Sequence, residues 1–320
     1  MMSEQAIGRA ARPAPASELT VGDVRLAFVP DGSICLPPVP LYDGGTRELF
    51  AANRQVLDAD GLLVMSLGSL LIESDGTRIL VDLGWGPSSQ DIPPGPEGEP
   101  RGRITGGLLL SNLARLGLGP ADIDLVVFSH LHADHVGWLA TDTTGGPRLT
   151  FPRAEHRLAE AEWRYWSDPG RGYRWGWPTP AQLELLGTRR SVLADGEVLA
   201  PGVSVRLTPG HTPGHASFVI ASGQQRAIVL GDTIHCPLEI SHPELALLSD
   251  VDPVAGRASR ALLQRELDDG AIAVGCHFPD YVFGRVVRDD SGRRLRDFSS
   301  RGRPRPAIRP RHSGETETAR

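Results

Sequence analysis

The sequence of 320 residues contains no lysine, so all 33 of its basic side chains are arginine. A chain without lysine cannot form a lysine Schiff base, use a lysine nucleophile or bind phosphate through a P-loop lysine. Cysteine is also scarce, with three residues, Cys35, Cys236 and Cys276, and no C-x-x-C spacing. This odd number argues against a disulfide framework and fits a reducing compartment, so we expect a cytoplasmic protein.

Long apolar runs and an excess of positive charge are missing as well. No run approaches the roughly 20 apolar residues of a membrane span, and residues 1–20 lack the apolar centre of a signal peptide. The net charge of -6 gives no general attraction to nucleic acid or to anionic membranes. We therefore expect neither a nucleic-acid nor a membrane partner.

Composition predicts how the chain is organised. Hydrophobic residues make up 40% of the sequence, which is enough for a sizeable core. We expect one globular domain over residues 21–298. It would lie between a disordered leader, residues 1–20, and a disordered arginine- and proline-rich tail, residues 299–320.

The densest chemical signal is the segment Ser-His-Leu-His-Ala-Asp-His-Val-Gly at residues 129–137. It follows an apolar run, residues 124–128, that is typical of a short buried strand. The segment places His130, His132, Asp134 and His135 on one strand-end loop. Imidazole and carboxylate groups are ligands that suit zinc and its first-row neighbours, so the segment predicts a metal site.

Three later strand ends also carry groups that could bind a metal. Residues 208–215 read Thr-Pro-Gly-His-Thr-Pro-Gly-His, with His211 and His215 in a tight loop. Asp232 follows a predicted strand at residues 227–230, where a buried carboxylate is costly unless it is paired or metal-bound. His277 ends another apolar run, and Cys276 beside it should face the core because side chains alternate along a strand.

The H-x-H-x-D-H pattern and these strand ends resemble those of the metallo-β-lactamase fold hydrolases, from about Val21 to Val287. The spacing resembles most the N-acyl homoserine lactonase and methyl parathion hydrolase group. The resemblance implies an α/β fold, an αβ/βα sandwich of two mixed β-sheets with helices on the outer faces. It implies that one metal ion is held by His130, His132 and His215, the other by Asp134, His135 and His277, with Asp232 bridging. His211 is then expected to be structural or to support a ligand.

The resemblance also implies a reaction. We expect two divalent metal ions, zinc first, with manganese, iron or cobalt as alternatives. Two such ions lower the pKa of a shared water toward about 7, and the hydroxide would cleave an ester-type bond in a small molecule. The substrate would be a lactone, an aryl ester or a phosphotriester. Asp134 and Asp232 are expected to accept a proton during the reaction.

His235 and Asp82 are expected to support this chemistry. His235 lies where lactonases carry a tyrosine that contacts the substrate, and a histidine there resembles the methyl parathion hydrolase branch. It would orient the substrate or protonate the leaving group. Asp82, in a D-x-G corner, is expected to hold the backbone or a ligand histidine.

Several alternatives stay open at this point. A glyoxalase II-like thioesterase is the second enzymatic reading, and a non-catalytic metal-binding scaffold is the third. A homodimer also stays open as an alternative to a single chain. Either the surface loop at residues 87–103 or the tryptophan cluster at residues 163–177 could wall a substrate pocket, and each could equally be structural. His156, expected on a helix, has no partner at ligand spacing and is expected to be structural.

Overall fold

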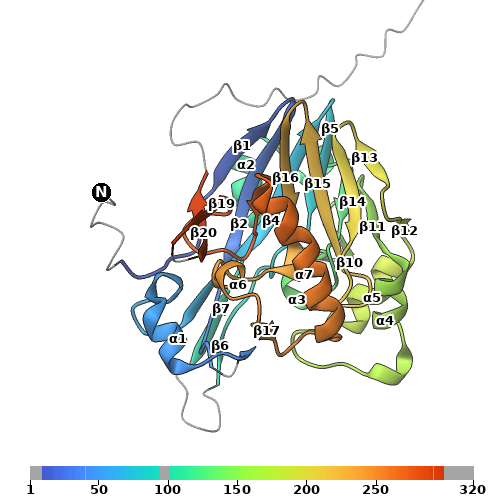
Figure 1. Ribbon diagram of the computed structural model, residues 1–320. Helices are drawn as coiled ribbons and strands as arrows, with labels where there is room; N and C mark the ends of the chain where they lie inside the picture. Colours follow the sequence, from blue (N-terminus) through green and yellow to red (C-terminus); the bar gives the residue numbers. More distant parts are fainter. Residues whose placement is uncertain (1–8, 40, 94–100, 291, 299–320) are drawn as a thin grey trace, which may run out of the picture.

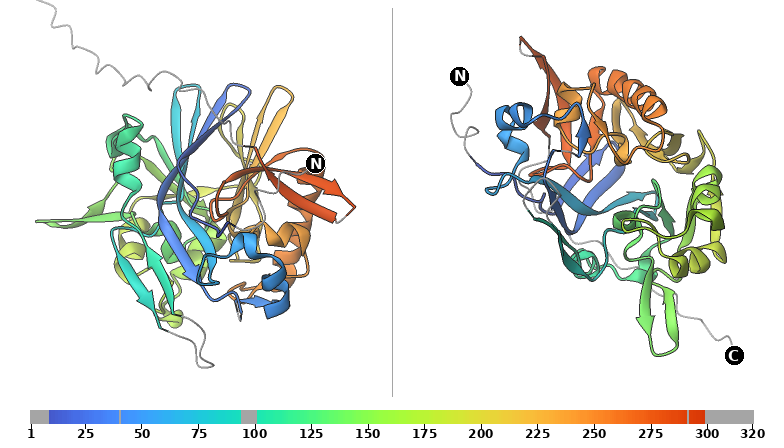
Figure 2. Two further views of the ribbon diagram at one scale, coloured as in Figure 1. Left: turned by 90° about the vertical axis from the view of Figure 1, so that its left-hand side faces the viewer. Right: turned by 90° about the horizontal axis from the view of Figure 1, so that it is seen from below.

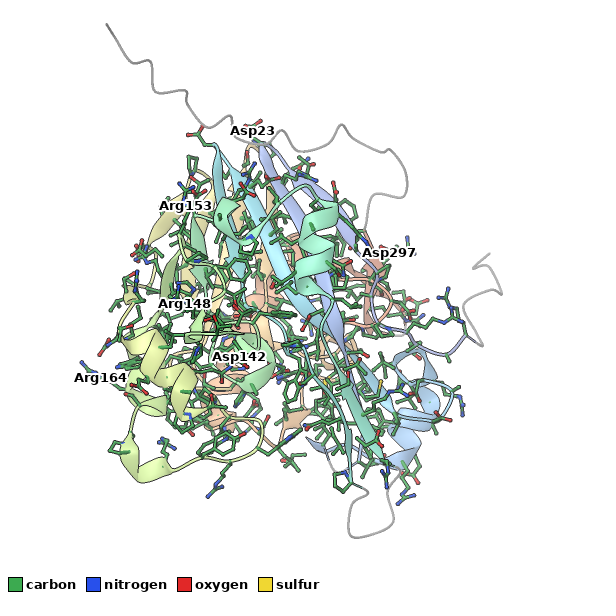
Figure 3. The ribbon with its side chains drawn as sticks, turned by 180° about the vertical axis from the view of Figure 1, so that it is seen from behind. Asp23, Asp142, Arg148, Arg153, Arg164 and Asp297 are labelled. Atoms are coloured by element: carbon green, nitrogen blue, oxygen red, sulfur yellow. The ribbon has the colours of Figure 1, made fainter. Side chains whose placement is uncertain are left out.

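The computed structural model describes residues 9–39, 41–93, 101–290 and 292–298. In these residues two large sheets pack face to face, with helices on their outer faces (Figures 1 and 2). The predicted αβ/βα sandwich is therefore confirmed. Figure 3, drawn from behind, shows side chains filling the interior, while charged residues such as Asp23, Arg164 and Asp297 lie at the rim.

The first sheet has the strand order β12-β11-β8-β5-β4-β2-β7-β6, with β1 added beside β2. Its strands are β1 (Ser17–Val21), β2 (Val24–Leu36), β4 (Leu63–Ser74), β5 (Thr77–Val81), β6 (Ser89–Ile92), β7 (Gly102–Thr105), β8 (Leu125–Val127), β11 (Glu155–Ala159) and β12 (Arg190–Leu193). Strands β5, β8, β11 and β12 run parallel. Their carboxyl ends therefore meet at one edge of the sheet, where β5 leads to Asp82 and β8 leads to His130.

The second sheet has the order β13-β14-β15-β16-β18-β19-β20. Its strands are β13 (Val198–Ala200), β14 (Val203–Leu207), β15 (Ala216–Ser222), β16 (Gln225–Val229), β18 (Ile272–Val274), β19 (Phe283–Asp289) and β20 (Gly292–Asp297). Because β16 and β18 are parallel, Asp232 and His277 follow them at the same edge. Strand β20 closes the sheet by pairing antiparallel with β19.

Apolar side chains explain why the layers adhere. The inner faces of both sheets share one core that includes fully buried Phe28, Phe218 and Phe283. Helices α2 (Leu109–Arg115), α4 (Glu160–Trp166) and α5 (Pro180–Gly187) cover the first sheet, and α7 (Pro253–Asp268) covers the second. Burying each such aromatic side chain contributes about 1.5–3 kcal/mol. The shared core joins both halves of the chain.

Shorter elements complete the described chain. The short helices are α1 (Arg47–Ala52), α3 (Ala133–Val136) and α6 (Leu238–Ser241), with single 3₁₀ turns at Arg54–Val56, Pro120–Asp122, Pro169–Arg171 and Gly231–Thr233. Two small ribbons pair β3 (Tyr42–Asp43) with β17 (Ala246–Leu247) and β9 (Ala140–Thr143) with β10 (Gly146–Leu149). Of the helices in the described residues, none combines the length and the apolarity that crossing a membrane would take.

Local sequence signals account for several boundaries. Strands β4 and β5 form a hairpin, and its turn uses Asp75 and Gly76 at φ values of 46° and 76°. This left-handed backbone suits an Asp-Gly turn. Asp252 caps α7 by accepting hydrogen bonds from the N–H groups of Val254 and Ala255.

The structure corrects the predicted leader over residues 9–20. Strand β1 pairs with β2, and Ala11 and Ala14 are buried. The N–H of Ala14 donates to Ser66 Oγ at 2.8 Å, and the N–H of Asp280 donates to the carbonyl of Arg12 at 2.8 Å. Alanine and proline give no periodic pattern, so the sequence did not reveal these distant partners. Residues 1–8 and the predicted tail, residues 299–320, lie outside the described residues.

The prediction of a surface loop at residues 87–103 was also wrong at its two ends, which form β6 and part of β7. Strands β6 and β7 pair antiparallel, and β7 continues the first sheet beside β2. Pairing of β7 with the long strand β2 holds this segment in the sheet, and the local proline- and glycine-rich sequence does not reveal that pairing. The tip, residues 94–100, lies outside the described residues.

Candidate metal centre

Strand ends from both sheets deliver a cluster of histidine and aspartate side chains. The residues come from the segment after β8, the loop between β14 and β15, the turn after β16 and the segment after β18. Six of the seven predicted metal residues meet there, namely His130, His132, Asp134, His135, Asp232 and His277. The parallel strand arrangement places these chemically similar ends side by side.

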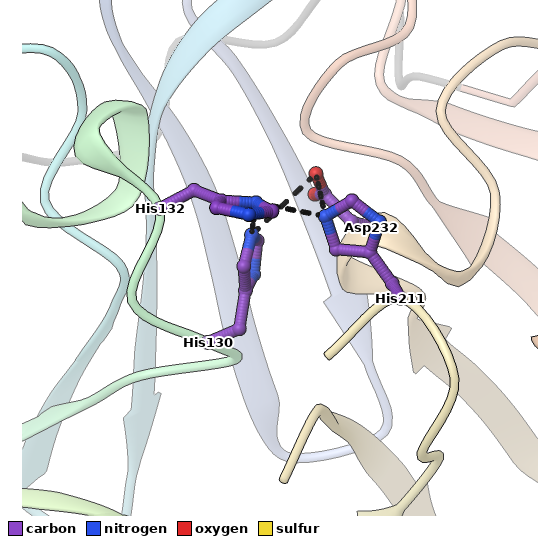
Figure 4. A group of neighbouring side chains, drawn as sticks. All are labelled: His130, His132, His211 and Asp232. Carbon is purple, nitrogen blue, oxygen red and sulfur yellow. Dashed lines mark hydrogen bonds and ion pairs between the residues drawn. The ribbon is translucent and has the colours of Figure 1, made fainter. Parts of the chain in front are cut away.

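The first group consists of His130, His132, His211 and Asp232 (Figure 4). Nδ1 of His132 lies 2.8 Å from Nε2 of His130 and 2.9 Å from Nε2 of His211. Oδ2 of Asp232 lies 3.4 Å from Nε2 of His211. One candidate ligand atom from each residue lies within 4.8 Å of the others, which is the spacing of donors around one ion.

The second group consists of Asp134, His135 and His277. The Nε2 atoms of the two histidines are 3.2 Å apart. Oδ2 of Asp134 lies 3.8 Å from each of these nitrogens. The Asp134 side chain is 23% exposed while both histidines are buried, so this group is open on the side of the aspartate.

Asp232 lies between the two groups. Its Oδ1 is 3.3 Å from Nε2 of His135 and 3.1 Å from Nε2 of His277, whereas its Oδ2 faces the first group. The Oδ1 atom is buried and has no hydrogen-bond partner in the described residues. Burial opposes its ionisation, yet the surrounding imidazoles lower the pKa of Asp232 well below its usual value. The two oxygens of this carboxylate therefore face the two groups.

The structure corrects the predicted ligand His215, because His211 occupies the first group instead. Both ring nitrogens of His215 are used by the fold. Nδ1 lies 2.8 Å from Thr208 Oγ1, and Nε2 accepts a hydrogen bond from the N–H of Asp232 at 2.9 Å. The two histidines stand in nearly identical Thr-Pro-Gly-His contexts, so no local signal separates them.

Oxygen atoms outside the two groups orient most of the clustered histidines. In these rings Nδ1 points away from the cluster and lies beside a protein oxygen. When Nδ1 carries the proton and donates it to that oxygen, the lone pair of Nε2 faces the group. These pairs are His130 with Ser129 Oγ (3.1 Å), His135 with Asp82 Oδ2 (2.9 Å), His211 with Asp250 Oδ1 (2.9 Å) and His277 with the Ser66 carbonyl (2.8 Å). Asp82 thus holds a histidine, as predicted, whereas the supporting roles of Asp250 and Ser66 were not predicted.

The donor set fits a divalent cation. Burial lowers the pKa of His132 and of His211 to about 3, so both rings are neutral at neutral pH. Neutral imidazole nitrogens and carboxylate oxygens are ligands that zinc takes in proteins. Burial opposes protonation of His135 and His277, but the charge of Asp232 raises the pKa of both, so this buried carboxylate favours positive charge beside it. A bound cation would supply such a charge.

His235 contacts the cluster at Asp232, with its Nε2 3.1 Å from Oδ2. Burial opposes protonation of this ring, but the charges of Asp232 and Glu239 raise the pKa of His235 to about 10. Glu239, fully buried, accepts hydrogen bonds from the backbone N–H of His235 and the hydroxyl of Tyr42, and it pairs with Arg260 at 3.0 Å. This network fixes His235, and it was not visible in the sequence.

The tryptophan cluster has two different surroundings. Trp163 and Trp166 pack into the core outside the first sheet, whereas Trp175 is 55% exposed and its ring centre lies 6.2 Å from that of Trp85. The N–H of Ala133, within the metal segment, donates to the carbonyl of Gly176 at 3.0 Å. The loop that carries Trp175 is thus tied to the metal segment.

His156, which was expected to be structural and to lie on a helix, lies on β11 instead. It is buried, and its Nδ1 lies 3.1 Å from the carbonyl of Ala154. Burial lowers the pKa of His156 to about 4. It is a core residue, as expected.

Comparison with known proteins places the chain in a family. Residues 69–277 match the model of the metallo-beta-lactamase superfamily. The chain belongs to this superfamily. The metallo-beta-lactamase match spans every residue of both groups.

Relatives within the superfamily include N-acyl homoserine lactonases. The AttM lactonase of Agrobacterium fabrum is 29% identical over 190 residues, which cover 53% of this chain and 64% of AttM. The lactonase of Bacillus cereus is 27% identical over 186 residues, covering 55% of this chain and 67% of that enzyme. The matched region thus spans less than two thirds of AttM.

Solved structures share the metallo-beta-lactamase architecture over a longer stretch. AidC, described as a dizinc quorum-quenching lactonase, superposes with a TM-score of 0.72 at 23% identity, covering 88% of this chain and 97% of AidC. The hydrolase AbOPH gives a TM-score of 0.69 at 22% identity, covering 89% and 97%. At these identities the likeness establishes the fold.

Proposed function

We propose that this metallo-beta-lactamase superfamily chain is a metal-dependent hydrolase that binds two divalent ions, zinc first, and cleaves an ester-type bond in a small molecule. The observation that carries the proposal is the position of Asp232 between two groups of buried ligands. His130, His132 and His211 would hold one ion, Asp134, His135 and His277 the other, and Asp232 both.

When bound, two divalent ions would polarise a substrate oxygen and lower the pKa of a water toward about 7. The residues of the chain then have separate tasks. Asp232 would hold the two ions together and, with the more exposed Asp134, is available to accept a proton. His235, fixed by Glu239, presents Nε2 beside Asp232, where it would orient the substrate or donate a proton to the leaving group.

A lactone is the first substrate candidate, with aryl esters and phosphotriesters as alternatives. AttM and AidC are lactonases, which supports this choice without extending their substrates to the present chain. The exposed Trp175 beside Trp85 offers an apolar surface near the metal segment that suits an acyl or aryl group.

The test is hydrolysis of a panel by zinc- or manganese-loaded protein, with a chelated sample as control. The panel contains acyl homoserine lactones, aryl esters, a phosphotriester and a glutathione thioester. Metal-dependent cleavage of a lactone or another oxygen ester would support the proposal. Cleavage of the thioester alone would favour a glyoxalase II-like enzyme, and a metal-loaded protein that cleaves none would favour a binding scaffold.

A further inference from the structure

Glu162 is a fully buried carboxylate that has no role in the chemistry proposed above. It lies on α4, whereas Glu160 on the same helix points to solvent. A carboxylate taken out of water is costly unless hydrogen bonds compensate for the lost hydration. Burial indeed raises the pKa of Glu162, although its hydrogen bonds oppose that rise.

The partners of this carboxylate belong to both loops of the first group. Oε1 accepts a hydrogen bond from the N–H of Leu131 at 3.0 Å, and Oε2 accepts one from the N–H of Gly214 at 3.1 Å. Leu131 lies between His130 and His132, and Gly214 lies three residues after His211. One side chain therefore joins the two loops that must converge.

The close approach of α4 to the second loop is built into the sequence. A Cβ atom added to Gly214 would lie 2.1 Å from the backbone nitrogen of Glu162, so only glycine allows this contact. Gly214, the second glycine of the Thr-Pro-Gly-His repeat, thus lets α4 pack against the loop. This close packing brings the Glu162 carboxylate within hydrogen-bonding distance of the loop backbone.

A third contact connects Glu162 to the ring of His132 through Trp166. The indole N–H of Trp166 donates to Oε1 of Glu162 at 2.5 Å. The Trp166 ring meets the ring of His132 in a T-shaped contact with centres 5.4 Å apart. Glu162 therefore fixes the backbone beside His132 and also the ring against which it packs.

We propose that Glu162 is a positioning residue that sets the geometry of His130, His132 and His211 by holding both loops through their N–H groups. This inference rests on the proposed two-ion site. The second group has different supports, since Asp82 orients His135 and the Ser66 carbonyl orients His277. Loss of Glu162 should consequently weaken the first ion and leave the second.

The experiment measures zinc bound to the full chain after equilibrium dialysis against buffered zinc. Glu162→Gln replaces one accepting oxygen with an NH2 group, which cannot accept a hydrogen bond from a loop N–H. Glu162→Asp keeps the charge, but its shorter side chain does not reach both loops. Trp166→Phe removes the indole N–H together with part of the buried ring. Glu160→Gln is the matched control, because Glu160 pairs with Arg164 and Arg190 on the surface. Far-UV circular dichroism of the metal-free proteins establishes that each variant is folded.

We expect two ions in the wild type and in Glu160→Gln, and an affinity for one ion reduced about 10- to 100-fold in both Glu162 variants. A smaller loss is expected in Trp166→Phe. In the background of His277→Ala, which should remove the second ion, Glu162→Gln should weaken binding of the remaining ion by the same factor. Folded Glu162 and Trp166 variants that keep two ions at wild-type affinity would overturn the positioning role alone. A wild type that binds no zinc would overturn the proposed function with it.

Discussion

His211 faces His132 across the first group, with its Nε2 2.9 Å from Nδ1 of His132. His215, four residues further on, instead accepts a hydrogen bond from the backbone N–H of Asp232. The repeated Thr-Pro-Gly-His loop therefore contributes one histidine to the candidate metal site and the other to the fold.

This division predicts different outcomes for the two alanine variants. His211→Ala should weaken zinc binding by about 100-fold or more while leaving the unfolding free energy of the metal-free protein nearly unchanged. His215→Ala should lower that free energy by about 1–3 kcal/mol, because Thr208 and the Asp232 N–H lose a buried partner. Zinc titration and urea unfolding check the two effects. The opposite pattern would return the ligand role to His215.

Replacement of the shared carboxylate should stop turnover without unfolding the chain. Asp232→Asn removes the charge that faces both groups, and His132→Ala removes a ligand atom of the first group. We expect hydrolysis to fall to the chelated background in both variants, with far-UV circular dichroism unchanged. Asp142→Asn, an exposed change on β9, is the control. Wild-type rates in metal-quantified Asp232→Asn would contradict the two-ion mechanism.

His235→Phe should separate catalysis from metal binding. The ring lies beside Asp232 but outside both ligand groups, so its loss should reduce kcat by about 100-fold or more while zinc content stays near that of the wild type. Parallel measurement of kcat and bound zinc tests this. An equal loss of zinc would identify His235 as a ligand.

Ser66 connects the segment around Ala14 to the segment that carries His277, so its loss should lower the free energy of unfolding. Its hydroxyl accepts the N–H of Ala14 and donates to the carbonyl of Phe278, while its own carbonyl lies beside His277. Ser66→Ala leaves two buried backbone groups unpaired and should lower the unfolding free energy by about 1–3 kcal/mol. Denaturant unfolding of metal-free protein measures this. Ser111→Ala, at an exposed position on α2, should change it by less than about 0.5 kcal/mol.

Asp268 gives a pH dependence away from the metal centre. Hydrogen bonds from Arg293 hold the pKa of this carboxyl below its usual value, against burial and with help from Arg288. A lowered pKa adds stability that is present above the unfolded value of about 3.9 and is lost as the pH falls through the folded pKa. Asp268→Asn should therefore cost up to about 1 kcal/mol at pH 7, and this cost should shrink as the pH falls through the folded pKa. A cost that does not change with pH over this range would contradict the ion-pair origin.

Local chemistry allowed much of the fold and site to be predicted. The Asp75-Gly76 turn, the Asp252 cap and the apolar periodicity of α2 depend on neighbours in the chain, so they are legible without a structure. The same holds for the segment at residues 129–137, where ligand types crowd one strand end. These patterns predicted the turn, the cap and a metal site, and the family resemblance that they carry implied the sandwich.

Only the tertiary structure decided which ring nitrogens face one another. The choice between His211 and His215, the supports from Asp250 and Ser66, and the burial of Glu162 between two loops all join residues that lie far apart in sequence. Residues 9–20 became ordered for the same reason, through contacts with Ser66 and Asp280. A pattern of nearby residues fixes what a side chain can do, whereas long-range packing fixes what it faces.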